Sequence, residues 1–169
     1  MFKETCSAIC ETLRSEFLPP PTKERCEAIS EEFWNLWNFP NCIGAADGKH
    51  VEIIAPPNSG SIFFNYKKHF STILMAVVDA TYRFVFVDIG AYGRNCDSTV
   101  FSESSFGRQM DDGTLPIPDD KFLPETSMKT PCVILADEGF PLRNNIMRPY
   151  SISQINRELA HFLFASSPA

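Results

Sequence analysis

Two aspartates each end a short apolar run, and they are the side chains of this sequence best suited to chemistry. Asp47 follows the apolar residues 44–46, and Asp137 follows residues 133–136, 90 positions later. Because a short apolar run predicts a buried strand, we expect each carboxylate at the end of a strand. Carboxylates gathered at a sheet edge are oxygen ligands for Mg²⁺ or Mn²⁺, although no third ligand is evident nearby.

A pair of such acids indicates a particular kind of reaction. Two carboxylates can share a pair of divalent ions about 3.5–4 Å apart, so that one ion activates water and the other steadies the leaving oxygen of a phosphodiester. Without metal, repulsion between the two charges should raise the pKa of one acid. Asp47 and Asp137 are therefore the candidate catalytic and metal-binding residues.

Each acid also has a simpler interpretation. Asp47 is followed by Gly48, and Asp-Gly is a strong signal for a two-residue hairpin turn. Asp137 could be a strand-end acid that only solvates a turn. A third aspartate, Asp97, opens a segment typical of a helix start, where an N-cap role would be a sufficient explanation.

Two helices are expected before the first strand. One apolar stripe recurs at helical spacing up to residue 17 and is stopped by three prolines at 19–21. A second stripe follows Thr22, a plausible cap, and ends before Pro40. We expect both stripes to pack in the core; their members are Phe2, Cys6, Ile9, Cys10, Leu13 and Phe17, then Cys26, Ile29, Phe33, Leu36 and Trp37.

Beyond residue 41 the pattern changes to short apolar runs that predict strands at 42–46, 51–54, 73–78, 84–89 and 132–136. The connection at 79–83 is short enough for an antiparallel hairpin, and the run at 73–78 should be buried on both faces. A helix should begin near Asp97, with Val100 and Phe101 facing inward. Residues 111–131 are expected to form an irregular loop, and 153–164 a weakly helical piece.

Antiparallel strands, then a helix, then a strand ending in an acid is the order of an RNase H-like sheet. The predicted fold is an α/β, RNase H-like mixed sheet, preceded by two helices and incomplete at its C-terminal side. The expected divisions are a helical segment at 1–38, the incomplete core at 39–152 and a divergent tail at 153–169. Missing final elements would expose a face of residues 133–135, which makes a homodimer an expected outcome.

The charge balance limits the mode of nucleic-acid binding. With 15 basic and 21 acidic residues, the net charge of −6 argues against broad attraction to DNA. Any DNA contact should be local, made by cations near the acids, or borrowed from a partner. The candidates are Lys49, Lys67, Lys68 and Arg94, for which a solvated surface is the simpler alternative.

Other motifs restrict the class of protein. The six cysteines include no Cys-x-x-Cys pair, so they are expected to be reduced and mostly buried. His50 and His69 have no cysteine or histidine at zinc-ligand spacing. The sequence has no signal-peptide-like start and no apolar run of membrane-spanning length, which predicts an intracellular, soluble protein without membrane contact.

Five separated blocks, in matching order, resemble the PIF/Harbinger transposase family, whose domain is called DDE Tnp4. The resemblance covers roughly residues 25–152. The blocks are FPNCIGAADGKHV at 39–51, NYKK at 65–68, VDA at 78–80, DIGAYGR at 88–94 with Asp97-Ser98, and ADEGFPL at 136–142 with MRPY at 147–150.

The resemblance implies an RNase H-like fold, a divalent metal, a DDE triad of acids and cleavage of DNA strands. In that pattern Asp47 matches the first acid and Asp137 the second, and Asp97 matches a further aspartate of the family pattern. The third acid is a glutamate in a basic stretch beyond the Arg-Pro-Tyr block, and this chain has no such stretch. Glu158 is near that position, but its neighbours do not match.

The expected function is a metal-dependent DNA endonuclease, a transposase-derived nuclease domain weakened or inactivated by the missing third acid. The alternative is a catalytically inactive transposase remnant that serves as an interaction protein. By resemblance, its partner would be a Myb-like DNA-binding protein. By resemblance, the expected location is the nucleus, with the cytoplasm as a second location.

Overall fold

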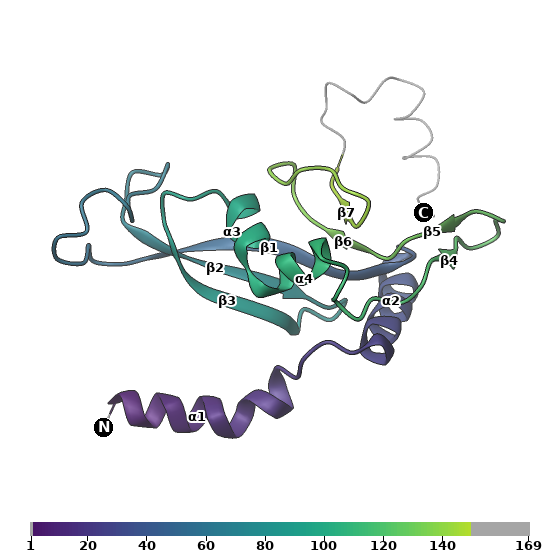
Figure 1. Cartoon of the computed structure of the whole chain (residues 1–169), viewed down its shortest axis with the longest axis horizontal. Coiled ribbons are helices and arrows are strands. Elements are labelled where there is room, and N and C mark those ends of the chain that lie inside the picture. Colours follow the sequence, from purple (N-terminus) through teal and green to yellow (C-terminus); the bar gives the residue numbers. More distant parts are fainter. Residues whose placement is uncertain (1, 150–169) are drawn as a thin grey trace.

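The computed structural model describes residues 2–149, so the segment predicted to be weakly helical at 153–164 and Glu158 lie outside the described residues. Figure 1 shows the order of the elements along the chain. They are α1 Phe2–Phe17, α2 Lys23–Trp37, β1 Cys42–Glu52, β2 Ser71–Val78, β3 Phe84–Tyr92, α3 Asp97–Glu103, α4 Ser105–Asp111, β4 Lys121–Phe122, β5 Lys129–Thr130, β6 Val133–Leu135 and β7 Ile146–Met147.

The main sheet has five strands in the order β3-β2-β1-β6-β7. β1 and β2 pair antiparallel, as do β2 and β3, whereas β6 is parallel to β1 and β7 is parallel to β6. This mixed sheet with helices confirms the predicted α/β, RNase H-like fold. β1 and β6 are neighbours in the sheet, although about 90 residues separate them in the sequence.

Strand β1 is one continuous strand, where the sequence pattern predicted two short ones. Asp47 pairs with Ala76 and Gly48 with Met75 in the antiparallel ladder with β2. Because both residues are held inside the ladder, the interpretation of Asp47-Gly48 as a hairpin turn is wrong. The burial changes along this strand: its first half is largely buried, and from Asp47 onward the side chains are exposed or half-buried.

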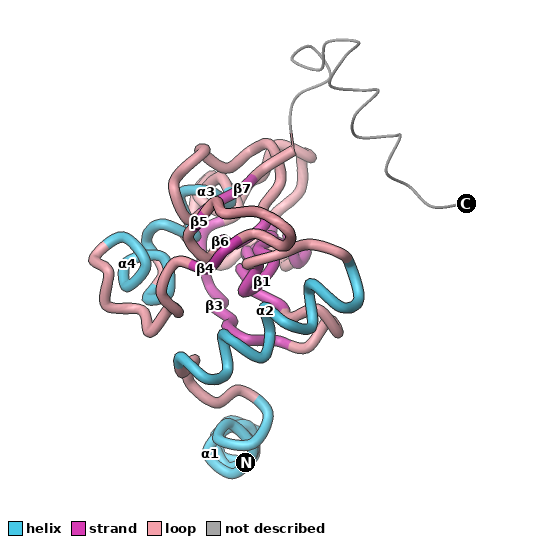
Figure 2. The backbone as a smooth tube through the Cα atoms, turned by 90° about the vertical axis from the view of Figure 1, so that its right-hand side faces the viewer, coloured by secondary structure: helices cyan, strands magenta, loops and turns pink. Residues whose placement is uncertain are grey.

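Helices cover both faces of the sheet. Figure 2 shows α2 on one side of the strands and α4 on the other. The cap predicted at Thr22 is confirmed, since its hydroxyl accepts a hydrogen bond of 3.2 Å from the Arg25 amide. The buried residues of α2 are Cys26, Ile29, Ser30 and Phe33, and those of α3 and α4 are Val100, Phe101, Phe106, Gly107 and Met110.

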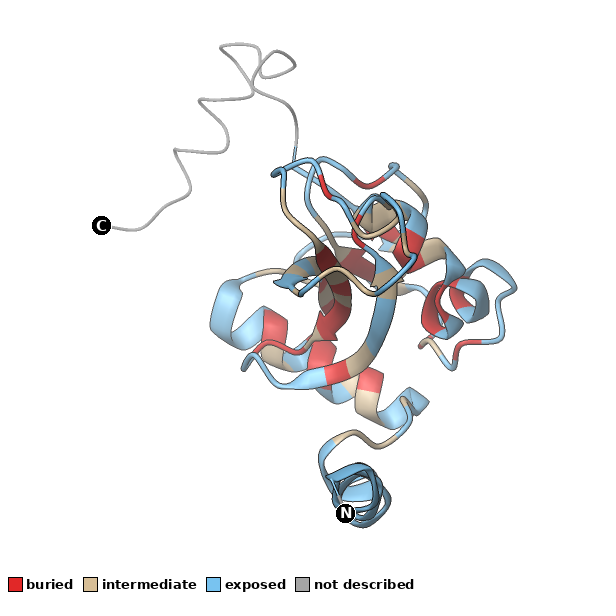
Figure 3. Cartoon of the chain, turned by 90° about the vertical axis from the view of Figure 1, so that its left-hand side faces the viewer, coloured by how far each residue is buried: buried red, intermediate tan, exposed pale blue. Residues whose placement is uncertain are grey.

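The first helix differs from the second. The helix predicted before the prolines is confirmed as α1, but none of its residues is buried, so the expected packing of its stripe in the core is wrong. Phe2 is 84% exposed and Phe17 66%. Figure 3 shows α1 as exposed throughout, at the side of the molecule and clear of the sheet. In α2 the prediction holds only in part, because Leu36 and Trp37 remain exposed.

The strand that leads to Asp137 is well covered. Val133 and Ile134 are buried, and β7 extends the sheet beyond β6. The predicted exposure of this face is therefore wrong, and the reason for expecting a homodimer from it no longer applies.

Burial of the cysteines is less complete than predicted: Cys26, Cys42 and Cys132 are buried, whereas Cys6, Cys10 and Cys96 are exposed free thiols.

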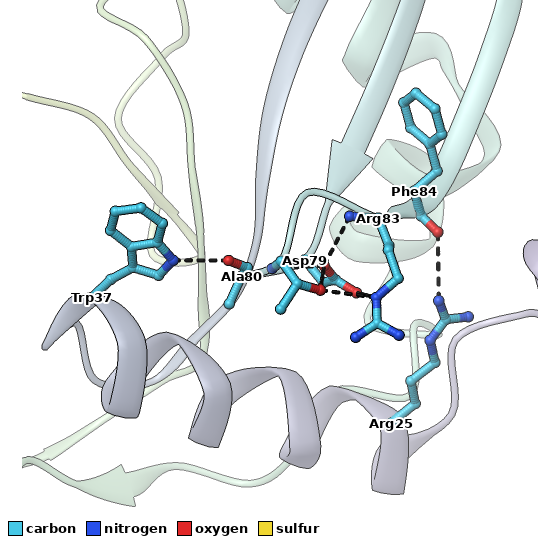
Figure 4. Close-up of polar contacts among 7 residues, drawn as sticks. Arg25, Trp37, Asp79, Ala80, Arg83 and Phe84 are labelled. Atoms are coloured by element: carbon cyan, nitrogen blue, oxygen red, sulfur yellow. Dashed lines mark hydrogen bonds and ion pairs between the residues drawn. The ribbon is translucent and has the colours of Figure 1, made fainter.

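The turn between β2 and β3 confirms the predicted hairpin at 79–83 and is held by several hydrogen bonds to Asp79. Asp79 Oδ1 accepts hydrogen bonds from the amides of Thr81 and Arg83, both 2.9 Å, and from the Thr81 hydroxyl, 2.8 Å. Trp37 at the end of α2 donates to the Ala80 carbonyl at 2.9 Å (Figure 4). These contacts attach α2 to one end of the sheet.

Two other regions complete the described chain. The 111–131 segment is mostly irregular, as predicted, but it includes the small β4–β5 pair. In β2, Ser71, Ile73, Met75, Ala76 and Val77 are buried, while Thr72, Leu74 and Val78 are half-buried, so its second face is less covered than expected. Among residues 2–149, no helix has the length and apolar character needed to cross a membrane.

Candidate metal centre

Parallel pairing of β1 and β6 brings Asp47 and Asp137 to the same end of the sheet. Ala45 pairs with Leu135 in this ladder. Asp47 follows Ala45 by two residues, and Asp137 follows Leu135 by two residues. The two acids therefore extend from neighbouring strands at matching positions, and both are exposed. Asp137 lies just beyond the end of β6, as predicted, but the predicted strand end at Asp47 is wrong, because β1 continues through Asp47 to Glu52.

Each of these carboxylates is oriented by a backbone amide close in sequence. Asp47 Oδ1 accepts from the Gly48 amide at 2.8 Å, and Asp137 Oδ1 accepts from the Gly139 amide at 3.0 Å. Within residues 2–149, neither Oδ2 atom takes part in a hydrogen bond or an ion pair. Each acid thus has one oxygen held in place and one oxygen available to a ligand.

Asp97 lies next to this pair, against the backbone of β1. A Cβ atom added at Gly48 would lie 2.2 Å from Asp97 Oδ1, so only glycine allows the carboxylate to approach this closely. The N-cap of α3 is Cys96, and Asp97 is the first residue of the helix, so the predicted N-cap role of Asp97 is wrong. Its Oδ1 atom is buried and has no hydrogen-bond partner among the described residues.

The electrostatic surroundings connect Asp97 to both other acids. Burial raises the pKa of the Asp97 carboxyl, and the negative charges of Asp47 and Asp137 raise it further, while His50 and Lys67 oppose the rise. Repulsion was predicted to raise the pKa of a member of the Asp47–Asp137 pair. Desolvation is the largest cause of the raised pKa of Asp97, and the effect of repulsion within the Asp47–Asp137 pair stays a prediction.

Strand alternation places Asp47 and Asp97 on opposite faces of β1. In β1, Asp47 and Lys49 lie on one face, and Gly48 and His50 lie on the face that meets Asp97 of α3. Within residues 2–149, no three side chains of His, Cys, Asp or Glu are grouped closely enough to hold a metal ion. The described part of the chain therefore places Asp47 and Asp137 at matching positions on neighbouring strands, with Asp97 on the opposite face of β1 from Asp47.

The predicted DNA-contacting cations are distributed around this end of the sheet. Lys67 is close enough to Asp97 for its charge to lower the pKa of that acid. Lys68 is exposed, with a positive φ of 65°, and Arg94 is exposed beyond β3. Lys49 is exposed on the Asp47 face of β1. For Lys49, Lys67, Lys68 and Arg94, contact with DNA stays a prediction.

One feature of the site was not predicted. His50, Asn65 and Ser71 form a hydrogen-bonded group beside Asp97, in which His50 Nδ1 and Asn65 Nδ2 each lie 2.8 Å from Ser71 Oγ. Sequence spacing gives no signal for it, because the group depends on the register between β1 and β2, in which Glu52 pairs with Ser71. Only the pairing of those strands brings residue 50 to residue 71.

Comparison with known proteins identifies relatives of this chain. The sequence model of the DDE superfamily endonuclease family matches residues 46–162. A protein named ALP1-like from Arabidopsis thaliana is 31% identical over 134 residues, which is 75% of this chain and 31% of that protein. HARBI1 of Xenopus laevis, whose name describes it as a nuclease, is 27% identical over 141 residues, which is 83% of this chain and 37% of that protein.

Human HARBI1 gives a similar result, with 27% identity over 145 residues, 85% of this chain and 38% of that protein. The chain thus spans about a third of the length of the curated relatives it matches. No solved structure matches it. Because the family model covers more than half of the sequence, including Asp47, Asp97 and Asp137, the chain belongs to the DDE superfamily endonuclease family.

Proposed function

We propose that this chain is the metal-binding part of a DNA endonuclease of the DDE type, in which Asp47 and Asp137 hold the divalent ions. The observation that supports this proposal best is the register of β1 and β6, which places two exposed acids at matching positions along neighbouring parallel strands. The nuclease names of the HARBI1 relatives support DNA as the substrate class.

The donor atoms fit Mg²⁺ or Mn²⁺. Both ions prefer carboxylate oxygens, and both keep water or substrate oxygens as further ligands. Asp47 and Asp137 each present an Oδ2 atom with no partner among the described residues, while the Gly48 and Gly139 amides hold the other oxygen. A site with two protein ligands leaves room for the phosphate of the substrate.

The roles of the side chains follow from this arrangement. When bound, divalent ions supply the positive charge that activates water and stabilises the transition state of phosphodiester hydrolysis. Asp47 and Asp137 would fix the ions at the end of the sheet, and their amide contacts would limit rotation of the carboxylates. Lys67 would attract the DNA backbone toward the same place.

We propose that catalysis by this chain is weak. DDE chemistry uses a third acid, and the family pattern places it in a stretch that this sequence does not match. Asp97 is close, yet it is not grouped with the other two acids in a way that could hold an ion. Loss of one ligand loosens the position of the metal, and changes around metal ligands commonly reduce activity or affinity 10–100-fold.

Plasmid nicking tests this proposal. Purified chain should convert supercoiled DNA to the nicked form slowly in Mn²⁺ and not in EDTA. Asp47→Asn and Asp137→Asn should each lower the rate at least about 10-fold. Asp120→Asn, an exposed acid in the 111–131 segment, is the matched control and should leave the rate unchanged. Equal nicking by all four proteins would contradict the assignment of the two acids.

A second candidate function is that of an inactive remnant that binds a partner protein. It is favoured by α1, whose apolar side chains make no buried contact, and by the net charge of −6. On this account, a Myb-like DNA-binding protein would supply DNA recognition. We propose a homodimer of this chain as a further assembly. Absence of Mn²⁺-dependent nicking, together with specific binding of such a partner, would favour this function.

Both candidate functions place the protein with DNA, so we propose residence in the nucleus, with the cytoplasm as a second location. Fluorescent tagging of the chain at either end, with imaging in cells of its source, tests this proposal. A signal confined to the cytoplasm would contradict it.

A further inference from the structure

A buried polar group lies under the imidazole of His50. Ser71, at the start of β2, is fully buried, and Asn65 is 2% exposed. Ser71 Oγ lies 2.8 Å from His50 Nδ1 and 2.8 Å from Asn65 Nδ2. The backbone of Gly93 packs against this group and leaves no room for a side chain, because a Cβ atom there would lie 2.5 Å from Ser71 Oγ.

The direction of these hydrogen bonds can be worked out from the partners of Asn65. Its Oδ1 atom accepts from the amides of Lys67, at 2.9 Å, and His69, at 3.3 Å. The amide nitrogen Nδ2 is therefore the end that faces Ser71, and it can only donate. Ser71 Oγ accepts this bond, and its own single proton requires another acceptor.

Within residues 2–149, His50 Nδ1 is the only other partner of the Ser71 hydroxyl, so the hydroxyl donates to it. A buried hydroxyl proton without an acceptor would be costly. When Nδ1 accepts, the neutral imidazole carries its proton on Nε2. The Ser71–Asn65 pair thus selects one tautomer of His50.

The Nε2 side of the ring has no hydrogen-bond partner in the described part of the chain. Asp97 Oδ1 likewise has no hydrogen-bond partner there, although Asp97 lies close enough to His50 for a charge interaction. Tyr66 packs edge-on against His50, with ring centroids 5.6 Å apart, and Lys67 Nζ lies 5.4 Å from the Tyr66 centroid. His50 and Lys67 thus both lie against Tyr66.

We propose that His50 Nε2–H and the Lys67 ammonium form a subsite for a phosphate of the DNA backbone, with Ser71 and Asn65 as positioning residues. Both groups offer donors and no acceptor, which suits a phosphate oxygen. Nε2–H can donate to a phosphate oxygen in both the neutral and the charged imidazole. The identity of the ligand as DNA rests on the proposed function.

The tautomer is measured first, without DNA or metal. Two-dimensional ¹⁵N–¹H correlation of the imidazole nitrogens at about pH 8, above the ordinary histidine pKa, should show His50 protonated on Nε2. Ser71→Ala should convert His50 to a mixture of tautomers, while His69, whose ring does not contact Ser71, should keep its wild-type signals. An Nδ1-protonated His50 in the wild-type chain would overturn the proposal.

Binding is measured next, by fluorescence anisotropy of a labelled DNA duplex at low salt in EDTA. His50→Ala and Lys67→Gln should each weaken binding about 3- to 10-fold, the effect of one lost hydrogen bond or phosphate contact. His50→Gln, which retains an N–H donor, should recover part of the loss. Lys129→Gln, an exposed lysine in the separate β4–β5 pair, is the matched control and should change binding less than about 2-fold.

The outcomes separate this proposal from the metal site. Because EDTA removes metal, a loss of binding in His50→Ala supports the subsite even if the chain neither binds Mn²⁺ nor nicks DNA. Wild-type affinity in both His50→Ala and Lys67→Gln would overturn the subsite, even if Asp47 and Asp137 prove to hold metal. Circular dichroism of each variant establishes that it is folded, and the wild-type tautomer decides the proposal if His50→Ala does not fold.

Discussion

Two aspartates packed on the same sheet are placed in opposite surroundings. Asp79, at the β2–β3 turn, accepts three hydrogen bonds through one oxygen, and its other oxygen lies 3.5 Å from Arg83 Nε. Asp97, behind β1, has a buried oxygen with no partner among the described residues. Burial opposes ionisation at Asp79, but its hydrogen bonds lower the pKa below its usual value, whereas burial raises the pKa of Asp97.

The difference between Asp79 and Asp97 indicates that the two regions of the sheet have different roles. A buried carboxylate with all its partners stabilises the fold, because its desolvation is offset by hydrogen bonds. A buried carboxylate without partners lowers stability and is typical of a functional site. The turn end of the sheet is therefore structural, and the end that holds Asp47, Asp97 and Asp137 is suited to binding. Four predictions test this contrast.

The largest effect is expected from removing the carboxylate of the turn. Asp79→Ala leaves the Thr81 and Arg83 amides without their acceptor and should lower the free energy of unfolding by about 2–3 kcal/mol, measured by urea denaturation. Asp79→Asn retains an acceptor oxygen and should lose less. If Asp79→Ala loses under about 0.5 kcal/mol, the turn does not have the structural role described here.

Filling the space between Asp97 and β1 should have the next largest effect. Gly48→Ala places a methyl group on Asp97 Oδ1, so α3 or the carboxylate must move, at a cost of about 1–3 kcal/mol in unfolding free energy. Combining it with Asp97→Ala should remove most of that cost in a double-mutant cycle. Simple additivity of the two changes would show that the methyl group does not act through Asp97.

Removing the orphaned charge should stabilise the chain. Asp97→Asn retains the shape of the side chain without a buried charge, and should raise the unfolding free energy by about 1 kcal/mol at pH 7, measured by thermal or urea denaturation. Asp120→Asn, at an exposed acid, should change it by less than about 0.5 kcal/mol. A loss of stability in Asp97→Asn would mean that the carboxylate has a stabilising role.

The smallest effect is in the pH dependence of stability. Because the pKa of Asp79 is lower in the folded chain than its unfolded value of about 3.9, ionised Asp79 stabilises the fold above that pH. The contribution is lost as the pH falls from about 4 through the folded pKa. The stability difference between wild type and Asp79→Ala should shrink over that range, and a constant difference would contradict the assignment.

Much of the arrangement could be predicted from local patterns. Stripes at helical spacing predicted both N-terminal helices, and short apolar runs predicted the segments of β1, β2, β3 and β6. Two of those runs are one strand, β1, and β7 was not predicted. The Asp47-Gly48 turn was wrong because a local dipeptide preference does not include pairing with Ala76 and Met75 on another strand. The core packing of α1 was wrong because an amphipathic stripe does not specify what covers it.

Some residues of the candidate site could likewise be predicted from the sequence, and others could not. Asp47 and Asp137 could be found from the ends of their apolar runs and from the family pattern. Burial of Asp97 against Gly48 and the Ser71 contact of His50 could not, because they depend on a helix position and on strand register. Such contacts join residues about 20 to 50 positions apart and have no periodic signal in the sequence.

The central claim is that Asp47 and Asp137 share a site for divalent ions, and titration calorimetry with Mn²⁺ tests it most directly. Wild-type chain and the Asp120→Asn control should give the same saturable binding, at one or two ions per chain. Asp47→Asn and Asp137→Asn should each weaken that binding at least about 10-fold, since both acids belong to one site. Unchanged Mn²⁺ binding in both variants would contradict the claim.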